Sequence, residues 1–238
     1  MPHASGTRRP RHHGVHARVT DSAATLAAEA LVGCYRELAR KRVHLLAPIL
    51  GDRAPVQWEH YPSDDAINRD RRYQWFYHSH DPEDRAGSGE HGHLHLFARM
   101  EGVADDIDER LELDYLRSLR TRPRSAATRH LIAIGLNPVG VPVLLFTVNR
   151  WVTGDLPLSG RATIAMLDAL RLDTGHPTID LVIQSILALY REEVRMLIME
   201  RDSVLMELPT RAPGPLEDRA IEMPSSVRID VDRRLAVL

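Results

Sequence analysis

Two apolar runs separated by a short turn constrain the fold of this chain most strongly. Residues 131–136 (Leu-Ile-Ala-Ile-Gly-Leu) and 143–148 (Val-Leu-Leu-Phe-Thr-Val) flank the turn sequence Pro138-Val139-Gly140. This pattern predicts a β-hairpin that runs from His130 to Asn137 and from Val141 to about Trp151. Because the strands are apolar on both faces, the hairpin must be central in a sheet or covered by helices.

A second hairpin is predicted earlier in the chain. Residues 72–80 are rich in aromatic side chains, which favours a strand, and residues 91–100 (His-Gly-His-Leu-His-Leu-Phe-Ala-Arg-Met) form another candidate strand. Residues 81–90 between them contain Pro82, Gly87 and Gly89, which is typical of a loop. We also expect residues 58–62 to form one short strand that enters a turn.

Helical periodicity is found on both sides of these hairpins. Apolar spacing predicts helices from Asp21 or Ser22 to about Arg42, and over residues 103–120, 160–172 and 178–207. The predicted fold class is therefore α+β, an antiparallel sheet of two or more hairpins covered by helices. We expect a disordered arm over residues 1–20, a single domain over 21–207 and a C-terminal tail or strap over 208–238.

The composition excludes several classes of protein. The net charge is about −2 and the arginines are scattered among acids, which argues against a nucleic-acid partner. Cys34 is the only cysteine, so the chain has neither an internal disulfide nor a cysteine metal cage. No signal peptide and no membrane-spanning run is found, so we expect a cytoplasmic protein without a membrane partner.

Five histidines lie within eighteen residues: His78, His80, His91, His93 and His95. The thirteen histidines of the chain, if spread evenly over 238 residues, would place about one there. Side chains two residues apart on a strand share a face, and opposed residues of paired strands lie ~4.5–5.5 Å apart at Cβ. Three or four imidazoles can thus converge on one point if the two segments pair.

This constellation predicts a site for a divalent transition metal, namely Zn, Fe or Cu, because imidazole suits these ions and thiolates are lacking. We prefer His78, His80, His93 and His95 as ligands, with His91 as the fifth candidate. Glu90 and Asp81 flank the cluster and are expected either to ligate or to fix the imidazole tautomers. The alternative is that these histidines are half-buried polar residues without a ligand.

Two further residues are candidates for binding a cofactor or a small-molecule ligand. Gln74 shares a strand face with His78, and Arg150 follows the apolar strand of the second hairpin, where it could clamp a carboxylate or phosphate. The competing interpretation of Arg150 is a structural ion pair with Asp155 or Glu59. We expect the isolated histidines His60, His130 and His176 to be capped or exposed residues rather than ligands, with His60 also a candidate to join the hairpin cluster.

The segment His91-Gly92-His93-Leu94-His95-Leu96-Phe97 resembles the motif of the histidine-triad nucleotide hydrolases and transferases. The resemblance implies that His93 attacks a nucleotide α-phosphate while His91 and His95 assist. It covers only seven residues and the Gly/Ser-bearing approach over residues 87–89. Gly92 replaces the bulky apolar residue usual in that family, and about 140 residues follow a motif that lies there near the chain end.

A wider set of segments resembles an uncharacterised family of bacterial proteins: residues 58–62 (Trp-Glu-His-Tyr-Pro), 77–81 (Tyr-His-Ser-His-Asp), 90–97 (Glu-His-Gly-His-Leu-His-Leu-Phe) and 149–154 (Asn-Arg-Trp-Val-Thr-Gly). This resemblance implies that the four segments belong to one unit, and it brings no activity with it.

Three functions therefore follow from the sequence, and it does not decide whether the protein is an enzyme. The first is a metal-binding protein or metalloenzyme, and the second is a nucleotide hydrolase or transferase that uses His93. The third is a non-enzymatic haem-binding, ligand-binding or interaction protein, in which Tyr73, Trp75 and Tyr77 line the pocket or partner surface. The 178–207 helix can pack on the sheet or form a homodimer with a second copy.

Overall fold

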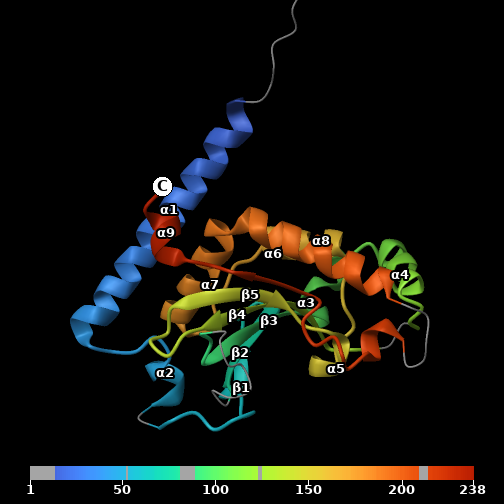
Figure 1. Ribbon diagram of the computed structural model, residues 1–238, viewed down its shortest axis with the longest axis horizontal. Coiled ribbons are helices and arrows are strands. Elements are labelled where there is room, and N and C mark those ends of the chain that lie inside the picture. Colours follow the sequence, from blue (N-terminus) through green and yellow to red (C-terminus); the bar gives the residue numbers. More distant parts are fainter. Residues whose placement is uncertain (1–13, 52, 81–88, 123–124, 209–213) are drawn as a thin grey trace, which may run out of the picture.

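The structure is a computed structural model that describes residues 14–51, 53–80, 89–122, 125–208 and 214–238 (Figure 1). It confirms the predicted α+β fold. Its six strands are β1 (Tyr61–Ile67), β2 (Tyr73–Ser79), β3 (Gly92–Arg99), β4 (Thr128–Leu136), β5 (Pro142–Thr147) and β6 (Ser225–Arg228). Its helices are α1 (Gly14–Lys41), α2 (Ala47–Leu50), α3 (Met100–Val103), α4 (Glu109–Ser118), α5 (Arg150–Thr153), α6 (Gly160–Asp168), α7 (Pro177–Leu189), α8 (Arg191–Glu207) and α9 (Val231–Leu235), with 3-10 turns η1 (Ala104–Asp106) and η2 (Pro215–Glu217).

All strands form one antiparallel sheet in the order β1-β2-β3-β4-β5-β6. Both predicted hairpins are present, as β2–β3 and β4–β5, and pairing of β3 with β4 joins them side by side. β4 is buried from position 130 onwards, as expected of a strand with two apolar faces. The strongly apolar hairpin is thus central, and it supports the histidine hairpin along one edge.

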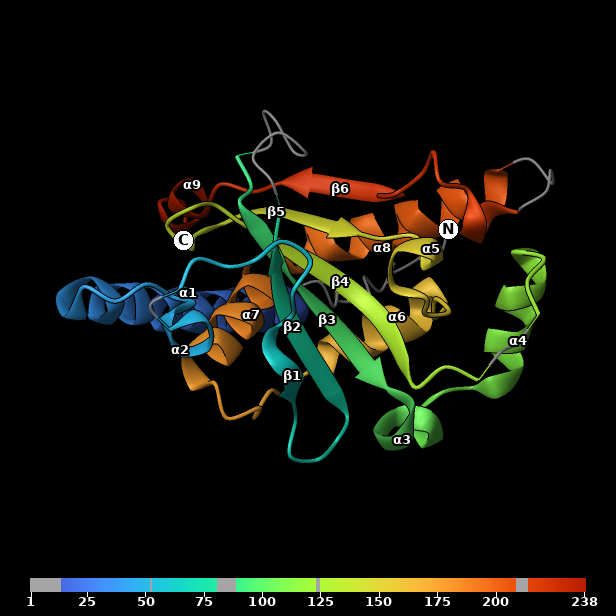
Figure 2. The ribbon, with the colours of Figure 1, turned by 90° about the horizontal axis from the view of Figure 1, so that it is seen from below.

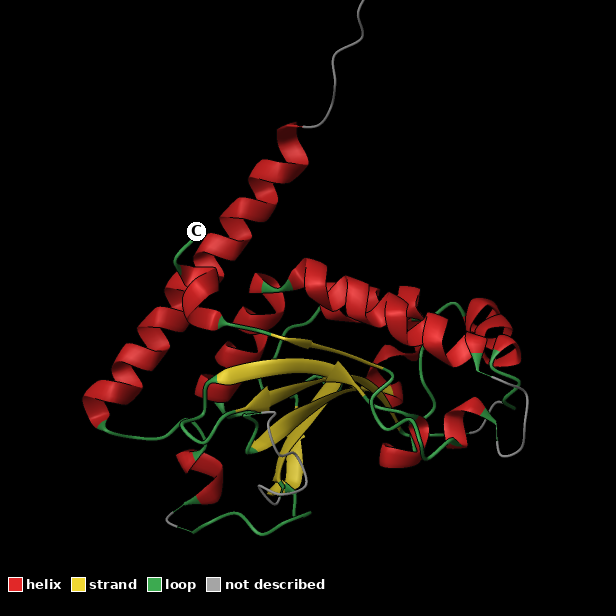
Figure 3. Cartoon of the chain, in the orientation of Figure 1, coloured by secondary structure: helices red, strands yellow, loops and turns green. Residues whose placement is uncertain are grey.

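The main helices cover one face of the sheet. Viewed from below, the strands lie in front of α6, α7 and α8 (Figure 2), and the side view shows the sheet as one layer beneath them (Figure 3). On β2, Tyr73 and Trp75 point to this helical side, where the Tyr73 hydroxyl donates to the Met166 carbonyl and the Trp75 indole donates to Asp180. The alternate residues of β2 therefore point to the opposite face.

All four predicted helices have bounds that differ from those observed. The helix expected over residues 103–120 is η1 followed by α4, and that expected over 160–172 ends at Asp168. The other two are the first and the last. The first begins at Gly14, so residues 14–20 are helical rather than part of a disordered arm. The part of α1 that packs on the core forms first, and adding further residues to a helix that is already formed requires little free energy. The expected 178–207 helix is two helices, α7 and α8, because the chain leaves helical geometry at Tyr190, where φ is −112° and ψ is 28°.

The break at Tyr190 also affects the expected homodimer. The apolar residues of α7, such as Ile179 and Ile183, are fully buried in the main core. On α8 the exposed apolar side chains are Met196, Met199 and Met206. The apolar face that suggested a partner copy is used largely within the chain, and a homodimer through α8 stays a prediction.

The residues that follow β5 are turned by a cap rather than continuing the strand. The Asn149 side chain accepts from the Arg150 backbone N–H and starts α5, so Trp151 lies on a short helix. The Asn149 side-chain amide donates to the Pro215 carbonyl, and the Trp151 indole donates to the Ile221 carbonyl. These bonds hold the C-terminal segment against the domain, where β6 adds to the sheet beside β5.

The short strand expected over residues 58–62 lies later, as β1, and contains Pro62. Proline cannot donate to a strand neighbour, and β1 is an edge strand, which tolerates it. Within the residues that the structure describes, no helix combines the length and apolarity that a membrane crossing requires.

Candidate metal centre

The histidines of the first hairpin lie on the sheet face opposite the helices. His78 on β2 and His80, the residue just beyond its end, share the face of Phe76, and on β3, His93 and His95 share one face in the same way. The register places His78 directly opposite His93. The predicted pairing of the two histidine-bearing strands is therefore present.

The four imidazoles form one compact cluster. The Nε2 atoms of His78 and His80 lie 3.1 Å apart, and those of His93 and His95 lie 2.9 Å apart. The ring centroids of His78 and His93 are 4.4 Å apart, so the two pairs are also in contact across the strands. His78, His80 and His93 each offer a nitrogen within 4.8 Å of the others, and this group could hold a metal ion.

All four rings are buried within the chain itself. His93 and His95 are 2% and 1% exposed, while His78 and His80 are each 8% exposed. Burying polar groups in this number is unfavourable unless each is hydrogen-bonded or ligated. The cluster therefore has an inner pair, His93 and His95, and an outer pair, His78 and His80.

The inner pair is held from behind by two further groups. Nδ1 of His93 contacts the buried Glu90 carboxylate, and Nδ1 of His95 lies 3.0 Å from Nε2 of His130. Such outer partners fix the orientation of imidazoles that ligate a metal through their other nitrogen. Both inner rings thus present Nε2 toward the centre of the cluster.

Burial keeps His95 and its partner His130 neutral. Loss of hydration lowers the pKa of His95 well below its ordinary value, and the neighbouring His130 and His78 lower it further. Burial, followed by the charge of Arg201, lowers the pKa of His130 to about 3. Neutral imidazole is the form that binds a metal ion, so neither ring has to lose a proton first.

With His93, His95 and His130 all neutral, the contacts fit one set of proton positions. A carboxylate only accepts, so the proton of neutral His93 is on Nδ1, facing Glu90. Nε2 of His93 then accepts from Nε2 of His95, whose Nδ1 accepts from His130. An ion bound to both Nε2 atoms requires the His95 proton to move to Nδ1 and the His130 proton to move from Nε2 to its own Nδ1, with no change at His93.

Two glycines provide the space for this arrangement. A Cβ on Gly92 would lie 2.4 Å from the His78 carbonyl oxygen, so only glycine lets the two histidine strands approach closely at this point. A Cβ on Gly135 would lie 3.1 Å from Cδ of Glu90. Gly92 is the residue that departs from the histidine-triad motif, and strand packing explains why it is glycine.

The remaining predicted site residues lie elsewhere. Nδ1 of His91 lies 3.0 Å from the Tyr77 hydroxyl. The amide of Gln74 contacts Asp65 and Arg99. Arg150 forms an ion pair with Glu217. The expected ion pair is thus present, but its partner is neither Asp155 nor Glu59. Asp81 lies outside the described residues.

His130 and Trp58 are the neighbours of the cluster that sequence reasoning missed. His130 is buried against His95, so its expected place as a capped or exposed residue is wrong. A register shift between β3 and β4 brings it opposite Phe97 on the histidine face, and only knowledge of that register could have identified it. His60 is exposed and stacks on Phe76, with ring centroids 3.6 Å apart.

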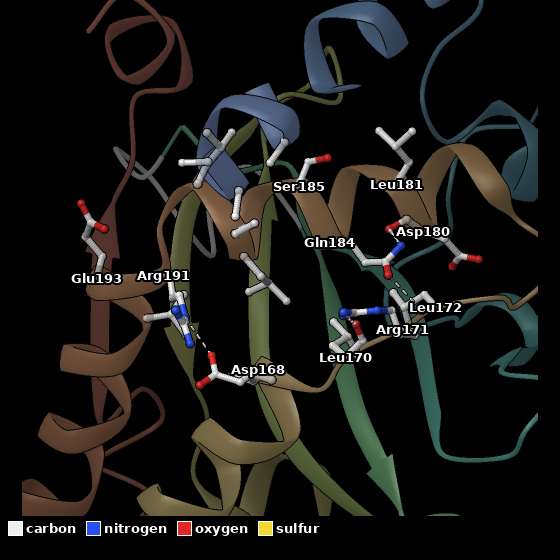
Figure 4. A pocket seen from close by; sticks show the side chains of 18 of the residues that line it. Asp168, Leu170, Arg171, Leu172, Asp180, Leu181, Gln184, Ser185, Arg191 and Glu193 are labelled. Atoms are coloured by element: carbon white, nitrogen blue, oxygen red, sulfur yellow. Dashed lines mark hydrogen bonds and ion pairs between the residues drawn. The ribbon is translucent and has the colours of Figure 1, made fainter. Parts of the chain in front are cut away.

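A separate cavity of about 1310 Å³ lies on the helical side of the molecule, lined by α1, α6, α7 and α8 (Figure 4). At its edge Asp168 accepts from Arg191 at 2.9 Å and from Arg195 at 2.8 Å. The expected pocket-lining aromatic residues Tyr73 and Trp75 belong to the core instead, because strand alternation turns them toward the helices. The cavity and the histidines are thus on opposite sides of the sheet.

Comparison with known proteins gives one match. Residues 25–229 match a family model described as a domain of unknown function, DUF6969. No curated protein matches the chain. No solved structure matches it either.

Proposed function

We propose that this chain, which belongs to the DUF6969 family of uncharacterised domains, binds a divalent transition-metal ion through His78, His80, His93 and His95. The family name carries no activity, so the support comes from the histidine cluster alone. The proposed function is metal binding on the sheet face opposite α6, α7 and α8.

The observation that carries the proposal is the spacing of the ring nitrogens. Two nitrogens bound to one ion at about 2.0–2.1 Å lie about 2.9–3.4 Å apart when the angle between them is about 90–110°. The two Nε2 pairs of the cluster, at 3.1 and 2.9 Å, fall in this range. Each Nε2 pair therefore has the spacing of two ligands to one ion, and His78, His80 and His93 lie close enough together to hold it jointly.

The donor atoms limit the ion. Four neutral imidazoles suit Zn²⁺, Cu²⁺, Fe²⁺ or Ni²⁺, whereas Mg²⁺ and Ca²⁺ prefer oxygen. The buried Glu90 carboxylate behind His93 offsets part of the charge that a divalent cation brings into the protein. A tetrahedral Zn²⁺ site with four histidines is closed, whereas an ion of higher coordination number keeps a position for a further ligand.

The histidine-triad alternative is less well supported by the same contacts. His93 would have to be an accessible nucleophile, yet it is 2% exposed and its two ring nitrogens face Glu90 and His95. His91, which the motif requires beside it, contacts Tyr77 instead. We therefore retain metal binding as the function of the cluster.

The direct test is metal analysis of the full chain prepared without a metal-affinity tag. Calorimetric titration of the chelator-treated protein with Zn²⁺ or Cu²⁺ should give one ion per chain. His93→Gln should remove most of this binding, and His91→Gln, a matched change of a neighbouring histidine, should retain it. Failure of the wild-type protein to bind any of these ions would overturn the proposal.

A second measurement does not depend on any variant. The ¹⁵N shifts of the imidazole nitrogens identify which nitrogen carries the proton. Metal should move the His95 proton from Nε2 to Nδ1 and leave the His93 proton on Nδ1. Unchanged shifts at both residues under saturating metal would show that the ion binds elsewhere.

A further inference from the structure

We propose that Trp58 covers the outer side of the metal site and sets the size of the additional ligand that the bound ion accepts. This inference rests on the proposed function, because it concerns the further coordination position of an ion that takes more ligands than the histidines supply. The ligand class that fits beneath the ring is a small donor such as water, hydroxide or azide, whereas a ring-sized donor is excluded.

The first support is the position of the Trp58 ring. It meets the outer pair edge-on, with centroid distances of 5.9 Å to His78 and 5.2 Å to His80. The inner pair is enclosed from behind by Glu90 and His130, so the outer pair marks the side nearer to solvent. A ligand that approaches the ion past the outer pair meets the Trp58 ring.

The second support is that Trp58 is held in an unfavourable backbone conformation. Its φ is 65°, in the left-handed region that bulky residues rarely adopt. Its side chain is also 64% exposed, so burial of the indole does not explain why the chain keeps it there. Strained residues of this kind persist where the surrounding structure enforces them, and they concentrate at functional sites.

The third support is the set of contacts that fixes this turn. The Tyr61 hydroxyl accepts from the Val56 backbone N–H at 2.9 Å and donates to Glu59 at 2.9 Å. Gln57, the residue before Trp58, forms a parallel bridge with Ser79, which lies between the two outer histidines. The turn is thus tied to the strand that carries His78 and His80.

The experiment uses full-length protein loaded with Co²⁺, whose visible absorption reports a change in its ligands. Azide is the small probe and imidazole the ring-sized probe. Trp58→Gly removes the indole and suits the positive φ, so the turn can remain folded. Trp58→Phe retains a smaller ring, and Trp151→Phe controls for loss of a tryptophan elsewhere.

We expect the wild-type protein to bind azide and to exclude imidazole. Trp58→Gly should raise the affinity for imidazole by at least about 10-fold relative to azide, and Trp58→Phe should raise it less. Trp151→Phe should match the wild type. If Trp58→Gly leaves the ratio of the two affinities unchanged, or if the wild type binds imidazole as well as azide, the inference is wrong.

The two proposals fail in different ways. A wild-type protein that takes up no Co²⁺, Zn²⁺ or Cu²⁺ contradicts the metal site itself. A protein that binds Co²⁺ through the histidines but accepts both probes without regard to Trp58 contradicts only the role of Trp58. Quenching of Trp58 fluorescence by Cu²⁺, absent in Trp58→Phe, independently checks that the ion lies near this ring.

Discussion

The two faces of the sheet are both buried, but they are buried for different reasons. On the helical face, side chains such as Trp75, Leu96 and Ile132 pack into the main core. On the other face, His93 and His95 are equally inaccessible, yet beside the rings of Phe76 and Phe146 they contact other titratable groups. The first face is explained by apolar burial, which stabilises the fold by roughly 25 cal/mol per Å².

The histidine face has no such explanation. An apolar set of side chains at the same positions would avoid the cost of dehydrating imidazoles and a carboxylate. Buried imidazoles and a buried carboxylate at these positions are expected when they bind a ligand. The comparison thus assigns stability to one face and function to the other, and four changes test that division.

The largest effect should come from Trp75→Ala on the helical face. Trp75 is fully buried, so its loss should lower the free energy of unfolding by about 3–5 kcal/mol. Because Trp75 points away from the histidines, the loss should be equal in chelator and in saturating metal. Urea denaturation under both conditions measures this, and a loss that depends on metal would break the division between the faces.

Glu90→Gln should act on function rather than on the fold. The change retains a hydrogen-bond acceptor beside His93 and removes its charge, so metal affinity should fall about 10–100-fold, or about 1.4–2.7 kcal/mol. Competition with a chelator measures the affinity. Glu101→Gln, which changes an exposed carboxylate just beyond β3, is the matched control and should bind like the wild type.

Acid should destabilise the metal-free protein through the histidine face. The pKa of His130 is lowered to about 3, so the folded state stays neutral where the unfolded chain, with a pKa near 6.5, takes up a proton. Stability is therefore complete above pH 6.5 and falls as the pH drops toward 3. At pH 5.5, proton uptake by His130 in the unfolded chain lowers the free energy of unfolding by about 1.4 kcal/mol.

Urea denaturation between pH 7.5 and pH 5.5, with chelator present, measures this dependence. His95, whose pKa is also lowered, should add to the same trend. In His130→Gln the stability should fall less steeply with acid than in the wild type. A stability that stays constant or rises from pH 7.5 to pH 5.5 would show that these imidazoles are not held neutral.

The smallest effect should come from His91→Asn. His91 carries the same side chain as the ligands and is two residues from His93, but it contacts Tyr77. Metal affinity should stay within about 2-fold of the wild type, as for a substitution outside the site. Calorimetry of this variant beside His93→Gln sharpens the comparison, and a large loss of affinity would place His91 in the metal site.

Much of the fold follows from local pattern. The two hairpins were predictable because the strand repeat of two residues and the turn residues are properties of short segments. The break at Tyr190 was not, because the apolar spacing of α7 and α8 reads as one continuous helix. The start of α1 was missed for a related reason, since Asp21 and Ser22 are residue types that favour the start of a helix.

The candidate site divides in the same way. The sequence by itself determined which residues can ligate a metal: period-two spacing places His78 with His80 and His93 with His95, whatever lies around them. Only the tertiary structure decided that His78 opposes His93, that His130 backs His95, and that Trp58 lies over the outer pair. The physical reason is that a backbone repeat is set by neighbouring residues, whereas register and long-range contacts depend on the packing of the whole sheet.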